Sequence, residues 1–161
     1  MISTEIPDIK SFTKKLFIDE TFDRFLLREA QITTFNTFSI DGTVHPDYFT
    51  DEELEEGKIE TLSTWKMVRP FCFSLIKGKH LPERFRIVLK YPEADLEGFI
   101  RKRGLNVTPD EVGGLFLNIL YENRQLSCIT GCSFKTFIMD KTLEHEWDDS
   151  IKALFKHEEI S

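Results

Sequence analysis

The chain has 161 residues, of which 40% are hydrophobic and 15 are phenylalanine, enough to bury a substantial core within one domain. No apolar run approaches the roughly 20 residues of a membrane-spanning helix, and the N-terminus lacks the basic-then-apolar pattern of a secretory signal. From this size and these missing segments we expect a cytoplasmic protein of one domain, residues 1–161, that binds no membrane. The formal net charge of -7 argues against non-specific adhesion to nucleic acid.

The beginning of the chain carries a helix signal followed by strand signals. Apolar residues at helical spacing predict a short opening helix over residues 9–16. Residues 27–40 are rich in Thr, Phe and Ile and lead into Asp41-Gly42, a dipeptide typical of tight hairpin turns. We therefore predict one long strand that returns briefly through residues 43–45.

Two further helices are predicted before the middle of the chain. Thr50 is a good N-cap with a capping-box partner three residues later, which predicts a short, exposed, acidic helix before Gly57. Apolar periodicity then predicts a largely buried helix over residues 65–76. Because Pro70 falls inside this pattern, either the regular helix begins near Val68 or the helix is kinked.

The second half of the chain continues with mixed strand and helix signals. Residues 84–91 alternate apolar and basic side chains and predict a strand, and residues 92–104 have the acidic-to-basic order that suits a helix. Later runs predict three strands with a bend at Gly131, at residues 115–122, 125–130 and 133–138. After Asp140, one apolar stripe predicts a final helix that packs on the sheet, formed by Leu143, Trp147, Ile151 and Leu154 or Phe155.

These signals indicate the fold class. Strand and helix signals neither alternate strictly nor segregate into two blocks. At least one group of strands is contiguous in the sequence, so its members pair through short turns. We therefore predict an α+β fold, a single domain with a mainly antiparallel sheet packed by helices, over a doubly wound fold.

Candidate catalytic or metal-binding groups have simpler structural interpretations. Cys128 and Cys132 lie four residues apart in a predicted strand without a second ligand pair, so we expect them to be reduced, to pack in the sheet and to bind no metal. His45 and His145 lie near acids that would suit a metal or a general base, but an acidic first helical turn is also what the helix dipole favours. Standard phosphate loops and nucleophile elbows are missing from the sequence, so no cofactor is expected.

The densest positive charge in this acidic chain follows the helix predicted at residues 65–76. Five Lys or Arg and one His stand between residues 77 and 90 against a single acid. Helix ends attract cations and charged edges protect strands, and these structural reasons account for most of the cluster. The density of charge that they leave unexplained suggests binding of an anion or an acidic partner. A semi-buried arginine in a mostly apolar helix also needs a carboxylate partner or a bound anion. The candidate binding residues are Arg69, Lys77, Lys79, His80, Arg84 and Arg86.

Four segments, ITTFNTFSIDG, WKMVRPFCFSLIKGKHLP, LFLNILYENRQLSCITG and MDKTLEHEWD, resemble the recurring segments of a family of small bacterial proteins classed as a domain of unknown function. The resemblance extends through most of the chain. It implies a self-contained domain in a bacterial cytoplasm and brings no activity, cofactor or catalytic residue with it.

Three functions compete. The first is a non-enzymatic binding protein whose basic segment, residues 77–90, meets an anionic ligand or an acidic partner, including a second copy through residues 51–56. The second is a nucleic-acid-binding module that uses the same segment, which the negative charge and the missing aromatic RNA-binding motif disfavour. The third is a small enzyme with a site built from His45, Asn36, the cysteine pair or the acidic C-terminal helix.

Overall fold

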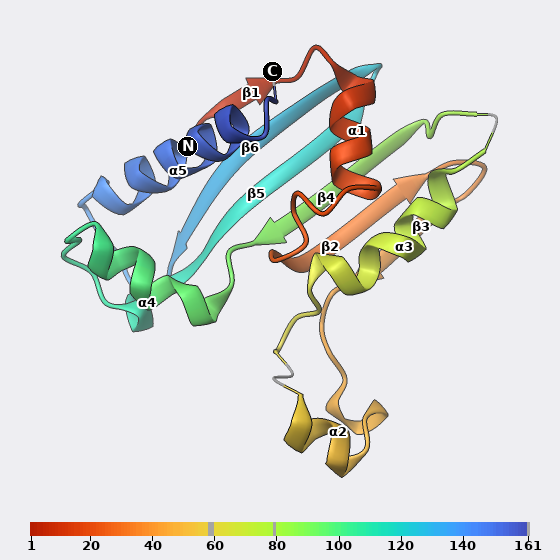
Figure 1. Cartoon of the computed structure of the whole chain (residues 1–161). Helices are drawn as coiled ribbons and strands as arrows, with labels where there is room; N and C mark the ends of the chain where they lie inside the picture. The colour runs from red at the N-terminus through yellow and green to blue at the C-terminus, as the bar shows by residue number, and fades with distance from the viewer. Residues whose placement is uncertain (58–59, 79, 161) are drawn as a thin grey trace.

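The computed structural model describes residues 1–57, 60–78 and 80–160, and it is built on one antiparallel sheet (Figure 1). The six strands are β1 (Ser3–Glu5), β2 (Leu26–Thr33), β3 (Thr37–Asp41), β4 (Arg84–Lys90), β5 (Val112–Glu122) and β6 (Gln125–Phe134). Their order across the sheet is β1-β6-β5-β4-β2-β3, and all neighbours are antiparallel. The α+β prediction is confirmed.

Helices cover one face of this sheet. The α-helices of the described residues are α1 (Ile9–Phe17), α2 (Asp51–Glu56), α3 (Trp65–Ile76), α4 (Glu93–Lys102) and α5 (Thr142–His157). α3 packs on β2, α5 packs on β6, and α1 contacts α3, so these three helices lie on the same side of the sheet (Figure 1). Within the described residues, no helix is long and apolar enough to cross a membrane.

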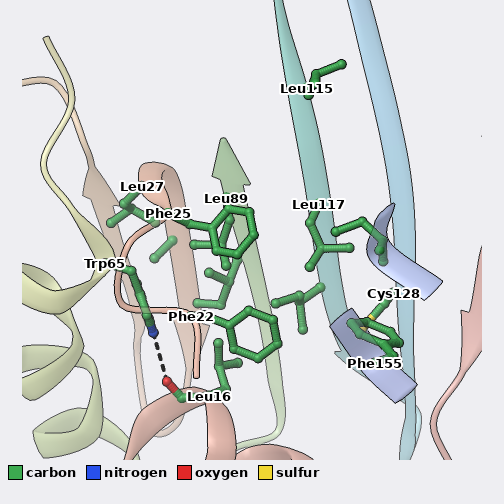
Figure 2. Packing of buried hydrophobic residues seen from close by; sticks show 14 of the residues in the cluster. Leu16, Phe22, Phe25, Leu27, Trp65, Leu89, Leu115, Leu117, Cys128 and Phe155 are labelled. Atoms are coloured by element: carbon green, nitrogen blue, oxygen red, sulfur yellow. Dashed lines mark hydrogen bonds between the residues drawn. The ribbon is translucent and has the colours of Figure 1, made fainter. Parts of the chain in front are cut away.

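The core lies between these helices and the sheet, and it is rich in aromatic rings. Phe17 on α1 meets Phe85 on β4 with ring centroids 5.2 Å apart, and it also contacts Trp65 on α3. The indole Nε1 of Trp65 donates a hydrogen bond of 2.8 Å to the carbonyl of Leu16, which ties α3 to α1 (Figure 2). The predicted stripe of the last helix is confirmed, with buried Leu143, Trp147, Ile151 and Phe155.

The long strand predicted at residues 27–40 is wrong. β2 ends at Thr33, the chain turns, and β3 returns beside it with Thr37 opposite Thr33. Gly42 serves a different purpose from a hairpin turn, because a Cβ at this position would lie 1.7 Å from the carbonyl oxygen of Leu27. Glycine is needed in the Asp41-Gly42 dipeptide because two backbone segments approach each other closely there, and not because of a hairpin turn.

Two other predictions need correction. β6 continues through Gly131 to Phe134 without a register shift there, so a separate strand at residues 133–138 does not form. α3 begins at Trp65 and includes Pro70, and it is less buried than predicted, because Phe71 is 69% exposed. The short β1 was not predicted at all.

Residues 44–57 form an arm that projects from the body of the molecule at the N-terminal end of α3 (Figure 1). The arm starts and ends near a bridge that pairs Thr43 with Leu62. It contains α2, and the predicted capping box is confirmed, because the Thr50 side chain accepts from the Glu53 backbone N–H and the Glu53 side chain accepts from that of Thr50. We call residues 44–57 the arm below.

Candidate functional site

Arg69, the arginine predicted to need a carboxylate or an anion, has a carboxylate. Its Nε and Nη2 atoms donate to the two carboxylate oxygens of Asp23 at 2.7 and 2.9 Å. Its Nη1 donates to the carbonyl of Ile18 at 2.7 Å. The two side chains are only 16% and 12% exposed, so this ion pair joins α3 to the segment that follows α1. Arg69 is therefore a structural link whose hydrogen-bonding capacity is largely used.

The two arginines of β4 are also paired. Arg84 donates to Glu122 at 3.1 Å and to the amide oxygen of Gln31 at 3.3 Å, and Arg86 donates to Glu29. Both side chains lie on the face of the sheet that α1, α3 and α5 leave uncovered, since the alternate residues of β4 face the core. Their acids come from β5 and β2, which flank β4 in the sheet. They form ion pairs across neighbouring strands.

The remaining candidates lie around the end of α3. Lys77 is the C-cap of α3, is exposed, and has no acid within ion-pair distance among the described residues. His80 is exposed, and Lys79 lies outside the described residues. The cluster expected from the sequence is thus divided between the helix-covered side, with Lys77, and the opposite face, with Arg84 and Arg86.

Lys77 lies at a groove of about 1330 Å³. Four separate segments form it: α1, the C-terminal end of α3, residues 81–83, and the turn between β5 and β6. Much of the lining is apolar, and Leu81 is 84% exposed there. The apolar and aromatic lining residues are Ile9, Phe17, Ile18, Phe73, Ile76, Leu81, Pro82 and Tyr121.

Charged side chains also line the groove, and cations outnumber acids among them. The charged lining residues comprise four cations, Lys10, Lys14, Lys77 and Arg124, and two acids, Asp8 and Glu83. Lys14 forms an ion pair of 3.5 Å with Asp19, whereas no ion pair within the described residues involves the other three cations. We call this site the basic groove; it suits an apolar surface that carries negative charge.

Sequence reasoning found only Lys77 among these four cations. Lys10 and Arg124 are far apart in the sequence and approach the groove because α1 and the β5–β6 turn meet the end of α3. Arg124 and its neighbour Asn123 have positive φ angles of 61° and 52°, which is the backbone of a tight two-residue hairpin turn. The short gap between the strands predicted at residues 115–122 and 125–130 implied a turn here but gave no sign of a binding site.

A second, more polar hollow of about 580 Å³ lies on the uncovered face of the sheet. Its cations already have partners within the chain. Arg28 lies over the ring of Phe116 at 5.2 Å, Arg86 binds Glu29, and Lys90 donates to Glu93 at 2.6 Å. Positive charge at this hollow is largely compensated.

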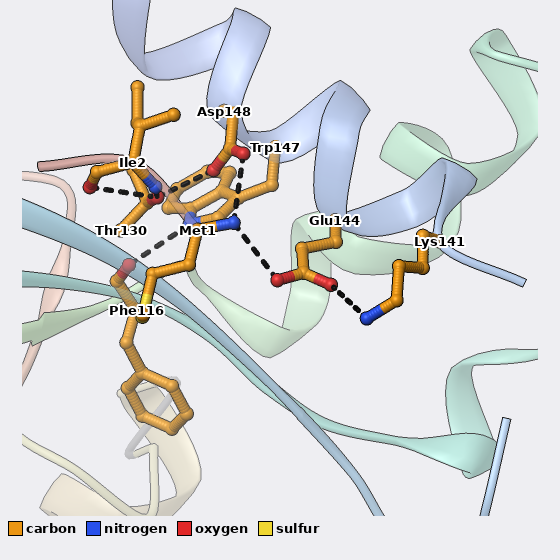
Figure 3. A network of polar contacts seen from close by, with 8 residues as sticks. All are labelled: Met1, Ile2, Phe116, Thr130, Lys141, Glu144, Trp147 and Asp148. Atoms are coloured by element: carbon orange, nitrogen blue, oxygen red, sulfur yellow. Dashed lines mark hydrogen bonds and ion pairs between the residues drawn. The ribbon is translucent and has the colours of Figure 1, made fainter. Parts of the chain in front are cut away.

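The acidic C-terminal helix uses its carboxylates internally (Figure 3). Asp148 is 6% exposed, accepts from the Thr130 hydroxyl at 2.5 Å, and pairs with the Met1 ammonium at 3.0 Å. The same ammonium donates to Glu144 at 2.9 Å, and this hydrogen bond raises the pKa of the amine and lowers the pKa of Glu144. The network fixes the N-terminus on α5.

The cysteines are free thiols. Burial raises the pKa of Cys72 and Cys128 to about 12 and that of Cys132 to about 11, so all three are protonated at neutral pH. His45 is exposed at the start of the arm. Within the described residues, no group of three or more His, Cys, Asp or Glu is arranged to hold a metal ion.

The chain belongs to a family of unknown function, DUF5721, whose model matches residues 15–161. This match confirms the resemblance to a domain of unknown function. No curated protein and no solved structure matches the chain.

Proposed function

We propose that this chain is a non-enzymatic binding protein whose basic groove takes an anionic ligand or partner with an apolar surface. One observation carries the proposal: an acidic protein places Lys10, Lys77 and Arg124, without ion-pair partners among the described residues, around an open apolar groove. The free thiols support a reducing, cytoplasmic compartment, and the resemblance supports a bacterial one.

The two kinds of lining have different physical roles. Burial of apolar surface contributes roughly 25 cal/mol per Å², so the apolar lining supplies the attraction that does not depend on charge. The cations orient the negative group, and salt weakens their contribution over a Debye length of about 8 Å at physiological ionic strength. A ligand that has both properties should therefore bind more tightly than one that has either alone.

The alternatives have less support. Arg84 and Arg86, on which a nucleic-acid site would depend, are already bound to acids, and the protein is negatively charged overall. A thiol enzyme would need a thiolate, whereas the pKa of Cys128 is about 12. The groove needs no such chemistry to bind a ligand.

Dodecanoate is a suitable probe, because it joins an apolar chain to a carboxylate. We expect calorimetric titration to detect saturable binding that weakens as NaCl is raised, and two-dimensional NMR to place the shifts at Ile76, Lys77 and Tyr121. Acetate supplies the charge alone and dodecyl maltoside supplies the chain alone, so both should bind more weakly.

Matched variants separate the groove from the rest of the surface. Lys10→Glu with Lys77→Glu reverses the rim, and Lys152→Glu with Lys156→Glu makes the same charge change on exposed positions of α5. Leu81→Ser removes an exposed lining side chain. We expect the rim and Leu81 variants to bind dodecanoate at least about tenfold more weakly, about 1.4 kcal/mol each. Equal binding by all four proteins would refute the proposal.

A further inference from the structure

The arm carries negative charge and exposed aromatic side chains, which complement the positive charge and the apolar lining of the basic groove. Residues 44–57 contain no Lys or Arg and carry six acids, Asp47, Asp51, Glu52, Glu53, Glu55 and Glu56. Apolar side chains accompany this charge. Tyr48 is 85% exposed and packs edge-on against Phe49 with ring centroids 5.5 Å apart, and Leu54 is half-buried on α2. The arm therefore presents negative charge together with aromatic surface.

The arm and the basic groove lie at opposite ends of α3. The arm joins the body beside Trp65, where α3 begins, whereas Ile76 and Lys77, at the other end of α3, line the groove. Twelve helical residues separate these ends by about 18 Å. The arm also points away from the groove (Figure 1). An arm placed in this way does not reach the groove of its own chain.

We propose that the basic groove of one chain binds the arm of a second copy. This inference rests on the proposed function and names the partner of the same site. In this complex Lys10, Lys77 and Arg124, which have no ion pair among the described residues, face the acids of the arm, and Tyr48 with Phe49 enters the apolar lining beside Ile18 and Leu81. The arm and the basic groove are thus complementary in charge and in apolar surface.

A two-fold symmetric pair satisfies both copies at once. Each chain offers one arm and one groove, so a symmetric dimer uses two identical contacts and leaves neither open. Because acids and cations meet at the surface, the dimer should weaken as salt rises. Sedimentation velocity of the whole chain should show a monomer–dimer equilibrium that shifts toward monomer between low and high NaCl.

Charge reversal on both sides provides the decisive test. The groove-reversed protein carries Lys10→Glu and Lys77→Glu, so its acidic arm faces an acidic groove. The arm-reversed protein carries Glu55→Lys and Glu56→Lys, so its less acidic arm faces a basic groove. Each alone should dimerise at least about tenfold more weakly than the natural sequence. An equimolar mixture should form more heterodimer than the groove-reversed protein forms homodimer, because the heterodimer keeps one natural contact, the unaltered arm in the unaltered groove, and its second contact pairs the acidic groove with an arm that has lost two of its six acids.

The substitutions are chosen to leave the fold intact. Glu55 and Glu56 are exposed in the last turn of α2, where lysine suits the helix dipole. Lys10 is exposed in the first turn of α1, where glutamate suits it. Lys77 follows the end of α3, where glutamate opposes the helix dipole. The control pair Lys152→Glu, Lys156→Glu includes the same unfavourable change, because Lys156 lies in the last turn of α5. Circular dichroism and urea midpoints should be measured for each variant to check that it is folded.

The outcomes distinguish this inference from the proposed function. A natural chain that stays monomeric at low salt overturns the inference, and so does a mixture without heterodimer or an unchanged dimer in both reversed proteins. If dodecanoate still binds the groove in those cases, the proposed function stands and only the partner is wrong. If the inference holds, dodecanoate should compete with dimer formation, and the arm-reversed protein should bind dodecanoate at least as well as the natural chain.

Discussion

Replacing Arg69 by methionine should destabilise the fold without affecting the groove. Methionine keeps a long apolar side chain but removes the guanidinium, so the Asp23 carboxylate loses both of its hydrogen bonds from Arg69 and the carbonyl of Ile18 loses one. The carboxylate is 12% exposed and has no other ion pair within the described residues. It therefore remains as a mostly buried, uncompensated charge.

The magnitude follows from this burial. Breaking a fully buried ion pair by removing one partner costs about 3–5 kcal/mol, and exposed pairs contribute about 0–1 kcal/mol. Since the Arg69 and Asp23 side chains retain 16% and 12% exposure, we expect a loss of about 2–3 kcal/mol for Arg69→Met. The matched control is Arg84→Met, whose ion pair with Glu122 is 42% and 44% exposed, and which should cost at most about 1 kcal/mol.

Urea unfolding followed by tryptophan fluorescence measures these costs as shifts of the midpoint at constant slope. Adding Asp23→Asn removes the uncompensated charge, so the double variant should be no less stable than Arg69→Met, and the two single changes should fail to add by about 1–2 kcal/mol. A cost for Arg69→Met as small as that for Arg84→Met, with simple additivity, would show that the pair is solvated and that the reasoning is wrong.

Further changes test other parts of the structure. Trp147→Ala should lower the free energy of unfolding by about 3–5 kcal/mol in urea, because Trp147 is 1% exposed and its Nε1 donates to a backbone carbonyl of β5; a barely changed midpoint would contradict its core position. The Met1 amine has its pKa raised above 8.0 in the folded state, so its contribution is complete below pH 8 and lost as pH rises through the folded pKa, and an acetylated N-terminus should not show this loss. Glu144 has its pKa lowered from 4.5, so its contribution is present above pH 4.5 and lost as pH falls through the folded pKa; urea midpoints measured across pH check both signs. Gly42→Ala should destabilise strongly because of the close carbonyl of β2, whereas Gly98→Ala on α4 meets no atom within 4 Å and should stabilise by about 0.5–1 kcal/mol, as thermal melts will show.

Local patterns predicted the elements that depend on local physics. α1 and α5 followed from apolar spacing, and the α2 capping box followed from two side chains three residues apart. The hairpin was misread because the demand on Gly42 comes from Leu27, fifteen positions earlier in the chain, and a tight contact between distant backbones has the same residue signature as a turn. β1, with three residues, is too short to show an alternation.

In the candidate site, too, the sequence predicted what depends on neighbouring residues and missed what depends on residues far away in the chain. The rule that a semi-buried guanidinium needs a carboxylate or an anion was right for Arg69, but the partner, Asp23, lies 46 residues away. The basic groove could not be predicted, because its cations come from segments that the sequence separates widely. Only Lys77 belonged to a conspicuous run of charge.

The distribution of ion-pair partners is the reason why we propose the basic groove, and not the face with Arg84 and Arg86, as the place where this acidic protein attracts an anion. An anion that approaches Arg84 must displace Glu122 or share the guanidinium with it, and the neighbouring carboxylate repels the newcomer. Lys77 has no ion-pair partner among the described residues, so an anion that approaches it does not have to displace an acid, and the four cations of the groove outnumber its two acids, Asp8 and Glu83. The apolar lining next to Lys77 lowers the local dielectric, which strengthens the attraction. A cation that is already bound to an acid of the same chain contributes little to binding an anion, and for this reason the proposed site lies at the end of α3 and not over the whole basic segment predicted from the sequence.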